Sequence, residues 1–339
     1  DRGEPVGREG DEQGQVEARE VGAAPHQRDD GSDSVHRPLS LGAGASRVGR
    51  GTLASVNIKR RLRRLVRPGA SGDAPNATGK PRSGSGAAPP PLKDGWTTGP
   101  PDYIGIGVQK AGTTRWWKLI VKHPDVVGWQ LKETHQLSRI GWRPVFDADR
   151  EAYYRYFPRP EGKMVGEWTP RYMNVPGVVE AMKTLAPEAR LLVLLRDPVE
   201  RYRSGVGQWQ KHKERRGKRL NLWAGRKDAY ARSFYGFALR PYVEAFGLER
   251  ILILQFEQCL QDPAGEYQRT LEFLGLPPWT PPPEVLGKAY NVSQKRPSPA
   301  ALDEPLDLIE TLVPDVRELL TFAPDIDLSL WPNFRHLAG

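Results

Sequence analysis

The chain has 339 residues, of which 38% are hydrophobic and 27% charged, and its formal net charge at pH 7 is +9. This hydrophobic fraction is enough for a sizeable core in one large or two small domains. The single cysteine, Cys259, excludes an intramolecular disulfide and argues against a disulfide-stapled fold or a structural zinc site. No apolar run approaches the roughly 20 residues of a membrane span, and no signal peptide is recognised, so the expected location is the cytoplasm.

Residues 1–95 are predicted to be a disordered, low-complexity tail. All ten Trp, eleven Tyr and nine Phe lie at or after Trp96, so nothing earlier can anchor a packed interior. Within the tail, residues 58–67 place apolar side chains among basic ones at helical spacing. This short basic amphipathic segment could make a weak contact with an anionic membrane, and a solvated segment without function is the alternative.

From Tyr103 onward, short apolar runs alternate with stretches of helical periodicity. The predicted strands are Tyr103–Val108, Val126–Trp129, Lys163–Glu167, Leu191–Leu195 and Ile251–Gln255. The predicted helices are Thr113–Lys122, Glu151–Phe157, Val178–Leu185, Val199–Lys211, Ala229–Phe246, Ala264–Leu274 and Leu306–Phe322, the last interrupted at Pro314. The order indicates an α/β domain over residues 96–339, with a mostly parallel sheet and helices on both faces. Ligands bind such sheets at the carboxyl ends of the strands.

The first motif with chemical content runs from Gly105 to Thr114, between a predicted strand and a predicted helix. Its glycines let the backbone curl around an oxyanion, the N–H groups of the helix N-terminus point at that anion, and Lys110 adds a positive charge. Lys110 precedes Gly112 by two residues, whereas a Walker A lysine follows the last glycine. The motif therefore indicates a phosphate-binding loop of another type, with an ordinary strand–helix turn as the alternative.

The second motif follows the apolar strand at 191–195. It consists of Arg196, Asp197 and Pro198, with Ser204 two turns into the next helix. Arginine can clamp a phosphate with two hydrogen bonds, and serine can donate one neutral bond. Arg196 and Ser204 could therefore converge on a second phosphate, although Arg-Asp-Pro could also be a structural ion pair at a helix N-terminus.

Together the two motifs resemble the sulfotransferases that use 3′-phosphoadenosine 5′-phosphosulfate (PAPS), in particular the bacterial and heparan-sulfate-type branch. That family has a Lys-x-Gly-Thr-Thr loop for the 5′-phosphosulfate, and an Arg followed eight residues later by Ser for the 3′-phosphate. Residues 166–172 resemble its Gly-Glu-Lys-Thr-Pro-x-Tyr segment, and residues 132–135 resemble its Lys-Glu-x-His segment. The resemblance covers about Asp102 to Phe334 and implies a P-loop-kinase-like fold.

The resemblance also implies roles for the matching residues. Lys110 would stabilise the leaving group, Glu133 would be the general base, and His135 would support or replace it. The donor would be bound by Lys110, Ala111, Gly112, Thr113, Thr114, Arg196 and Ser204, with Lys295 or Arg296 closing over the 3′-phosphate. The acceptor side would comprise Glu133, Trp168, Thr169, Arg171 and Tyr172. No metal is expected.

Two departures limit the resemblance. Trp168 stands where the branch has lysine, and Arg115 stands where the cytosolic animal branch has an adenine-stacking tryptophan. We expect a sulfotransferase nearer to bacterial relatives, acting on a hydroxyl of a carbohydrate or small natural product. Without basic runs interleaved with aromatics, no nucleic-acid partner is expected, and the acceptor and the oligomeric state stay open. The alternatives are a nucleotide-dependent small-molecule kinase of the same fold and a non-catalytic protein that binds anionic glycans.

Overall fold

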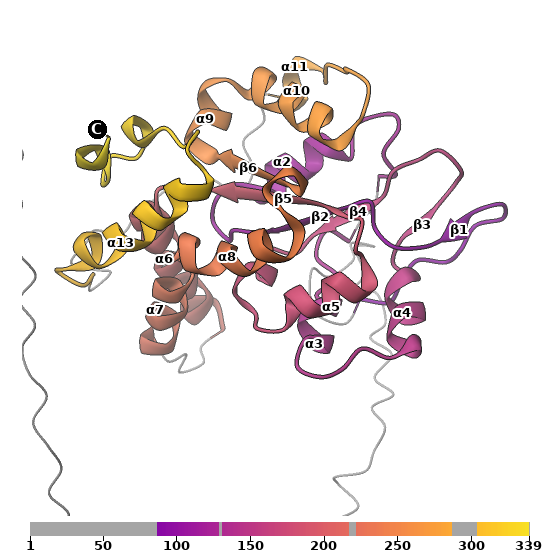
Figure 1. Cartoon of the computed structure of the whole chain (residues 1–339), viewed down its shortest axis with the longest axis horizontal. Coiled ribbons are helices and arrows are strands. Elements are labelled where there is room, and N and C mark those ends of the chain that lie inside the picture. The colour runs from indigo at the N-terminus through magenta and orange to yellow at the C-terminus, as the bar shows by residue number, and fades with distance from the viewer. Residues whose placement is uncertain (1–86, 129–130, 217–221, 287–303, 339) are drawn as a thin grey trace, which may run out of the picture. The chain divides into compact units, whose positions relative to one another are not determined.

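The computed structural model describes residues 87–128, 131–216, 222–286 and 304–338. At the centre is a four-stranded sheet in the order β4-β2-β5-β6 (Figure 1). Its strands are β2 (Tyr103–Gly107), β4 (Gly166–Trp168), β5 (Arg190–Leu195) and β6 (Ile251–Gln255). All three neighbouring pairs are parallel, so the four carboxyl ends lie along one edge of the sheet. The predicted α/β fold with a mostly parallel sheet is confirmed.

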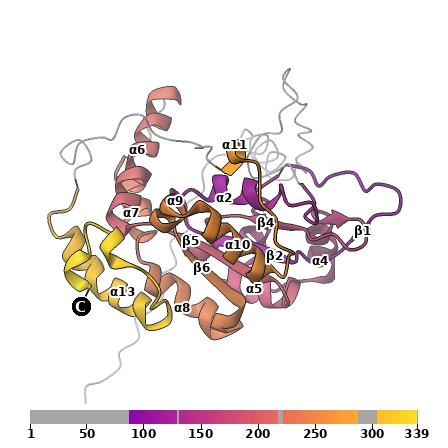
Figure 2. The same cartoon turned by 90° about the horizontal axis from the view of Figure 1, so that it is seen from above.

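Helices cover both faces of this sheet (Figures 1 and 2). On one face lie α2 (Thr113–Ile120), α9 (Phe256–Gln261) and α10 (Pro263–Leu274), and on the other lie α5 (Val178–Leu185) and α8 (Tyr235–Phe246). The Trp116 indole donates to Thr270 Oγ1 at 3.0 Å and thereby joins α2 to α10. Because both faces are covered, the strands are apolar and almost wholly buried.

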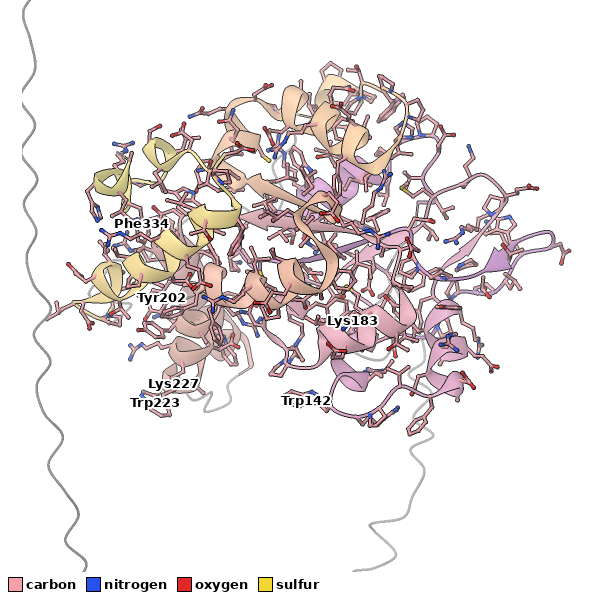
Figure 3. All side chains as sticks on the ribbon, in the orientation of Figure 1. Trp142, Lys183, Tyr202, Trp223, Lys227 and Phe334 are labelled. Atoms are coloured by element: carbon pink, nitrogen blue, oxygen red, sulfur yellow. The ribbon has the colours of Figure 1, made fainter. Side chains whose placement is uncertain are left out.

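The remaining elements lie around these layers. They are α3 (Gln136–Ile140), α4 (Asp147–Tyr154), α6 (Pro198–Arg216), α7 (Leu222–Ala231), α11 (Pro283–Leu286), α13 (Leu308–Phe322), the antiparallel pair β1 (Thr97–Thr98) and β3 (Pro158–Arg159), and the 3₁₀ turns η1 (Tyr172–Asn174), η2 (Leu248–Arg250), η3 (Leu328–Leu330) and η4 (Arg335–Leu337). Side chains fill the space between the layers (Figure 3). Tyr202 and Phe334 are buried there, whereas Trp142 and Trp223 are exposed.

Several predicted elements differ from the structure, and three of the differences change the kind or continuity of an element. The strand predicted at Val126–Trp129 is wrong for its described residues, where only Val126 forms an isolated bridge, to Met164. The helix predicted over Ala229–Phe246 is broken between α7 and α8, where the Ser233 hydroxyl accepts from the buried Arg201 guanidinium at 3.0 and 3.1 Å. Helix α13 runs through Pro314 without the predicted interruption.

The described part begins before the predicted domain boundary at residue 95. Ala87 packs against the core, and its carbonyl accepts a 2.9 Å hydrogen bond from the Tyr156 hydroxyl. Packing therefore extends at least to residue 87. The amphipathic segment predicted at 58–67 lies outside the described residues. Within the described ranges, no helix combines the length and the apolar character needed to cross a bilayer.

Candidate active site

The loop between β2 and α2 curls through two residues in the left-handed region. Lys110 has a φ of 75° and Gly112 has a φ of 85°. Glycine adopts this conformation freely, whereas a lysine there is strained, and such strain clusters at functional sites. Helix α2 begins at Thr113, so the N–H groups of Thr113 and Thr114 open the helix without carbonyl partners from a preceding turn. The loop therefore has the geometry of an anion-binding turn at the carboxyl end of β2.

Side-chain exposure differs along this loop. Ala111 and Thr113 are buried, whereas Lys110 and Thr114 are partly exposed. A Cβ added to Gly112 would overlap the ring of Phe256, so the close approach of this ring also requires glycine. The loop is thus packed against Phe256 at Gly112, while the Lys110 side chain stays partly exposed to solvent.

Arg196 lies directly beside this loop. It follows β5, the neighbour of β2, and its Nη1 donates to the Lys110 carbonyl at 3.2 Å. Its guanidinium also lies over the Phe256 ring, 5.3 Å from the centroid, and 3.4 Å from the Glu200 carboxylate. The structure thus brings the two predicted phosphate-binding motifs together at one edge of the sheet. Ser204 lies half-buried on α6, and Lys295 and Arg296 lie outside the described residues.

Asp197 fixes the turn that carries Arg196. Its buried carboxylate accepts from the backbone N–H groups of Val199 at 2.9 Å and Glu200 at 3.1 Å, which begin α6. It also accepts from the Asn333 amide at 2.9 and 3.0 Å. Burial raises the pKa of Asp197, and these donors oppose the shift. The suspected Arg-Asp ion pair is therefore not what holds this turn, because Arg196 pairs with Glu200 instead.

The predicted base is joined to the phosphate-binding loop by Lys132. The Lys132 ammonium donates to Thr113 Oγ1 at 3.2 Å and to Glu133 Oε1 at 3.0 Å. The other oxygen of Glu133 lies 3.5 Å from His135 Nε2. The Glu133 side chain is 31% exposed, so an incoming hydroxyl could reach it. The structure therefore brings Glu133 and His135 together, next to the loop of Lys110.

His135 has a left-handed backbone, with φ of 58°, and a mostly buried ring. Burial lowers the pKa of His135; Glu133 counters that shift, and Arg171 adds to it. The neutral form of the ring is therefore favoured. Burial also lowers the pKa of Lys132, against the opposing effect of the Glu133 carboxylate. By geometry, Glu133 is the carboxylate acceptor of the group, between the Lys132 ammonium and the His135 ring.

The predicted acceptor-side residues at 168–172 divide into two groups. Trp168, Thr169 and Tyr172 are fully buried, so direct contact with an acceptor is not seen for them, and their role on the acceptor side stays a prediction. The Trp168 indole donates to the Gly107 carbonyl at 3.0 Å, and the hydroxyls of the other two contact the buried Glu167. Arg171 is exposed and close enough to His135 to affect its pKa. Of the acceptor-side residues predicted within 168–172, only Arg171 is exposed.

The remaining question about this edge is whether it could hold a metal. Among the residues that the structure describes, no three or more His, Cys, Asp and Glu side chains are grouped as metal ligands. The charges at this edge come instead from Lys110, Lys132, Arg196 and Glu133. Glu167 and Tyr153 had no role in the sequence-based prediction, and Lys132 entered it only as the ion-pair partner of Glu133 in the alternative to a catalytic base, a pair that the structure contains.

Comparison with known proteins identifies the family. Residues 101–281 match the model of the sulfotransferase family, which is more than half of the chain. This chain belongs to the sulfotransferase family. A sulfotransferase from Alicyclobacillus acidocaldarius has the same fold, with a TM-score of 0.54 and 23% identity over 68% of this chain and 98% of that one.

Curated relatives of this sulfotransferase-family chain come from several eukaryotes. It is 30% identical over 189 residues to heparan sulfate glucosamine 3-O-sulfotransferase 3A1 of Mus musculus, covering 52% of this chain and 46% of that protein. It is 33% identical over 106 residues to the membrane-associated sulfotransferase kil1 of Dictyostelium discoideum, covering 30% and 21%. The chain thus spans about half, or less, of the length of these relatives. The family predicted from the motifs is confirmed, while the individual site roles and the bacterial affinity stay predictions.

Proposed function

We propose that this chain transfers a sulfuryl group from PAPS to a hydroxyl of a carbohydrate or small natural product. The observation that carries the proposal is the contact of Lys132 with both Thr113 and Glu133, because it joins an anion-binding loop to an accessible carboxylate. The family supports sulfuryl transfer as the reaction, and the heparan sulfate named in the mouse relative supports a carbohydrate acceptor.

Each residue of the site has a part in the proposed reaction. Glu133 takes the proton of the acceptor hydroxyl as its oxygen attacks sulfur. The bond between sulfur and the bridging oxygen of the donor breaks, and Lys110 stabilises the negative charge that develops on that oxygen. The products are the sulfate ester, the proton on Glu133 and adenosine 3′,5′-bisphosphate.

Binding of the donor is assigned to the two adjoining motifs. The N–H groups and hydroxyls of Thr113 and Thr114 would bind the 5′-phosphate, as at other helix N-termini. Arg196 would bind the 3′-phosphate, with Ser204 from α6. Because Arg196 is paired with Glu200 at 3.4 Å, a phosphate would have to compete with or join that pair. The positive charge of these side chains matches the two anionic ends of the donor.

The test is a transfer assay with sulfur-labelled PAPS and a set of acceptors that includes heparan sulfate, simple glycosides and phenols. We expect label in at least one acceptor, and a loss of about 100- to 10,000-fold in kcat for Glu133→Gln, the range for a general base. The variant should still bind adenosine 3′,5′-bisphosphate. An unchanged rate in Glu133→Gln would remove Glu133 from the mechanism, and phosphate transfer from ATP would favour the kinase alternative.

A further inference from the structure

The buried carboxylate of Glu167 lies at the centre of a cluster of hydroxyl groups. Its Oε1 accepts from the Tyr153 hydroxyl at 2.9 Å and the Tyr172 hydroxyl at 3.0 Å. Its Oε2 accepts from the hydroxyls of Thr169 at 2.6 Å and Thr134 at 2.8 Å, and from the Thr134 backbone N–H at 3.2 Å. All five partners donate, and an ionised carboxylate only accepts, so the surroundings match an ionised Glu167. We call these five residues the Glu167 cluster.

The Glu167 cluster accepts hydrogen bonds from the backbone N–H groups of four consecutive residues, 134–137. Thr134 N donates to Glu167, and the next three amides, at 135, 136 and 137, donate to the hydroxyls of Thr169 at 3.4 Å, Thr134 at 3.3 Å and Tyr172 at 3.3 Å. Helix α3 begins at Gln136, and the first N–H groups of a helix have no partner within it. The cluster therefore supplies acceptors to the first two residues of the helix and to the two residues before it.

The other side of Glu133 is held by the same strand. The backbone N–H of Trp168, next to Glu167, donates to the Lys132 carbonyl at 2.8 Å. The main chain is thus fixed at Lys132 and at Thr134, on either side of Glu133. The Glu133 side chain itself stays 31% exposed and makes no contact with the cluster in the part of the chain that the structure describes.

We infer that Glu167 is a positioning residue that holds Glu133 and His135 in their relative orientation. A buried carboxylate is costly, and a well-packed apolar side chain would give similar or greater stability. The hydrogen bonds of Glu167 instead fix a main-chain segment whose exposed carboxylate must be aimed at a substrate. This inference rests on the proposed function, because the role of Glu133 as base comes from it.

Two variants test the inference from different members of the cluster. Glu167→Gln keeps the shape, but its amide N–H₂ cannot accept from donors, so part of the network must reorganise. Tyr172→Phe removes the acceptor of the Leu137 amide and keeps the ring in place. The matched control is Tyr267→Phe, which also removes one hydroxyl from a buried tyrosine; that hydroxyl donates to the Leu119 carbonyl at 3.2 Å, in α2. If one variant does not fold, the other still decides.

Two readouts are measured on each protein. The first is sulfuryl transfer from PAPS to the acceptor found for the wild type, together with the Kd for adenosine 3′,5′-bisphosphate. We expect kcat to fall about 10- to 100-fold in the two cluster variants, as for a displaced catalytic group, with little change in Kd. The second is amide hydrogen exchange at residues 134–137, which we expect to accelerate at least about tenfold, equivalent to about 1.4 kcal/mol of local opening. Tyr267→Phe should change neither readout.

Four results would overturn the inference. In the cluster variants, these are unchanged amide exchange at residues 134–137, faster exchange there with a wild-type kcat, or faster exchange spread over the whole domain. The fourth is an equal fall in kcat in the control, Tyr267→Phe. A wild-type protein that transfers no sulfuryl group to any acceptor would refute the proposed function instead. In that event the exchange readout alone decides whether Glu167 holds the segment.

Discussion

Lys110 adopts a backbone conformation that few lysines adopt, and Arg196 donates to its carbonyl. Residue by residue, the site depends on such cross-contacts: Lys132 joins Thr113 to Glu133, and Asp197 holds the turn of Arg196. The sequence motifs predicted which residues would gather at the sheet edge, because parallel strands end on one side. They could not predict the contact of Lys132 with Thr113, because the two residues lie far apart in sequence.

Substitution of Arg196 tests the second phosphate site. We expect Arg196→Ala to weaken binding of adenosine 3′,5′-bisphosphate about tenfold or more, as for loss of a charge-assisted hydrogen bond. Binding of adenosine 5′-phosphate, which lacks the 3′-phosphate, should change much less. Calorimetric titration of both nucleotides into the variant and the wild type measures the difference. Equal loss for the two nucleotides would mean that Arg196 does not contact the 3′-phosphate.

Among the elements, a mostly parallel sheet and most of the helices could be predicted, because apolar strands and amphipathic helices alternate clearly; the strand order was not predicted. The burial of residues within 168–172 could not be predicted from the sequence. The resemblance of this segment implied acceptor-side residues, but it could not show that Trp168 and Tyr172 are buried, because their burial depends on packing against β2 and α3. Likewise, no local pattern reveals that Tyr153 of α4 reaches Glu167. A glutamate within an otherwise apolar strand was the one available signal for that cluster.

The C-terminal segment at residues 331–333 is hydrogen-bonded to the turn between β5 and α6 and to the Glu257 side chain beside it. Asn333 donates to Asp197, and the Trp331 indole donates at 3.0 Å to Glu257, which itself accepts the Asp197 N–H. We expect Asn333→Ala to lower the free energy of unfolding by about 1–3 kcal/mol, because the buried Asp197 carboxylate loses the two hydrogen bonds of the side-chain amide. Urea unfolding measures the loss. Gln268→Ala, which removes a 2.9 Å amide bond to the Trp279 carbonyl, serves as control and should cost less. A loss no larger than the control would show that the segment does not stabilise the turn.

At the scale of the whole domain, several buried carboxyl groups make stability depend on pH. Burial raises the pKa of Glu167, Asp197, Glu257 and Asp315. A carboxyl with a raised pKa in the folded state contributes stability below its unfolded pKa of about 4, and that contribution is lost as pH rises through the folded pKa. Asp149, whose pKa is held at about 2 chiefly by Arg143, contributes in the opposite direction, in a more acidic range.

Asp315 allows this dependence to be measured away from the site. It lies on α13 and accepts the N–H groups of Gly236 and Phe237 at 3.0 and 2.8 Å. We expect the difference in free energy of unfolding between the wild type and Asp315→Asn to be largest near pH 4 and to narrow as pH rises toward 7. The difference narrows because only the wild type loses stability when Asp315 ionises. Unfolding by urea at several pH values gives the difference. A difference that is constant or widens with pH would contradict the raised pKa.

On the proposed function, the edge formed by β2 and β5 binds a nucleotide with two separate phosphates. Calorimetric titration with adenosine 3′,5′-bisphosphate, and in parallel with ATP and magnesium, tests it most directly. We expect tight binding of the bisphosphate without metal and weak binding of ATP. Preferential, magnesium-dependent binding of ATP would contradict it and would favour a kinase built on the same fold.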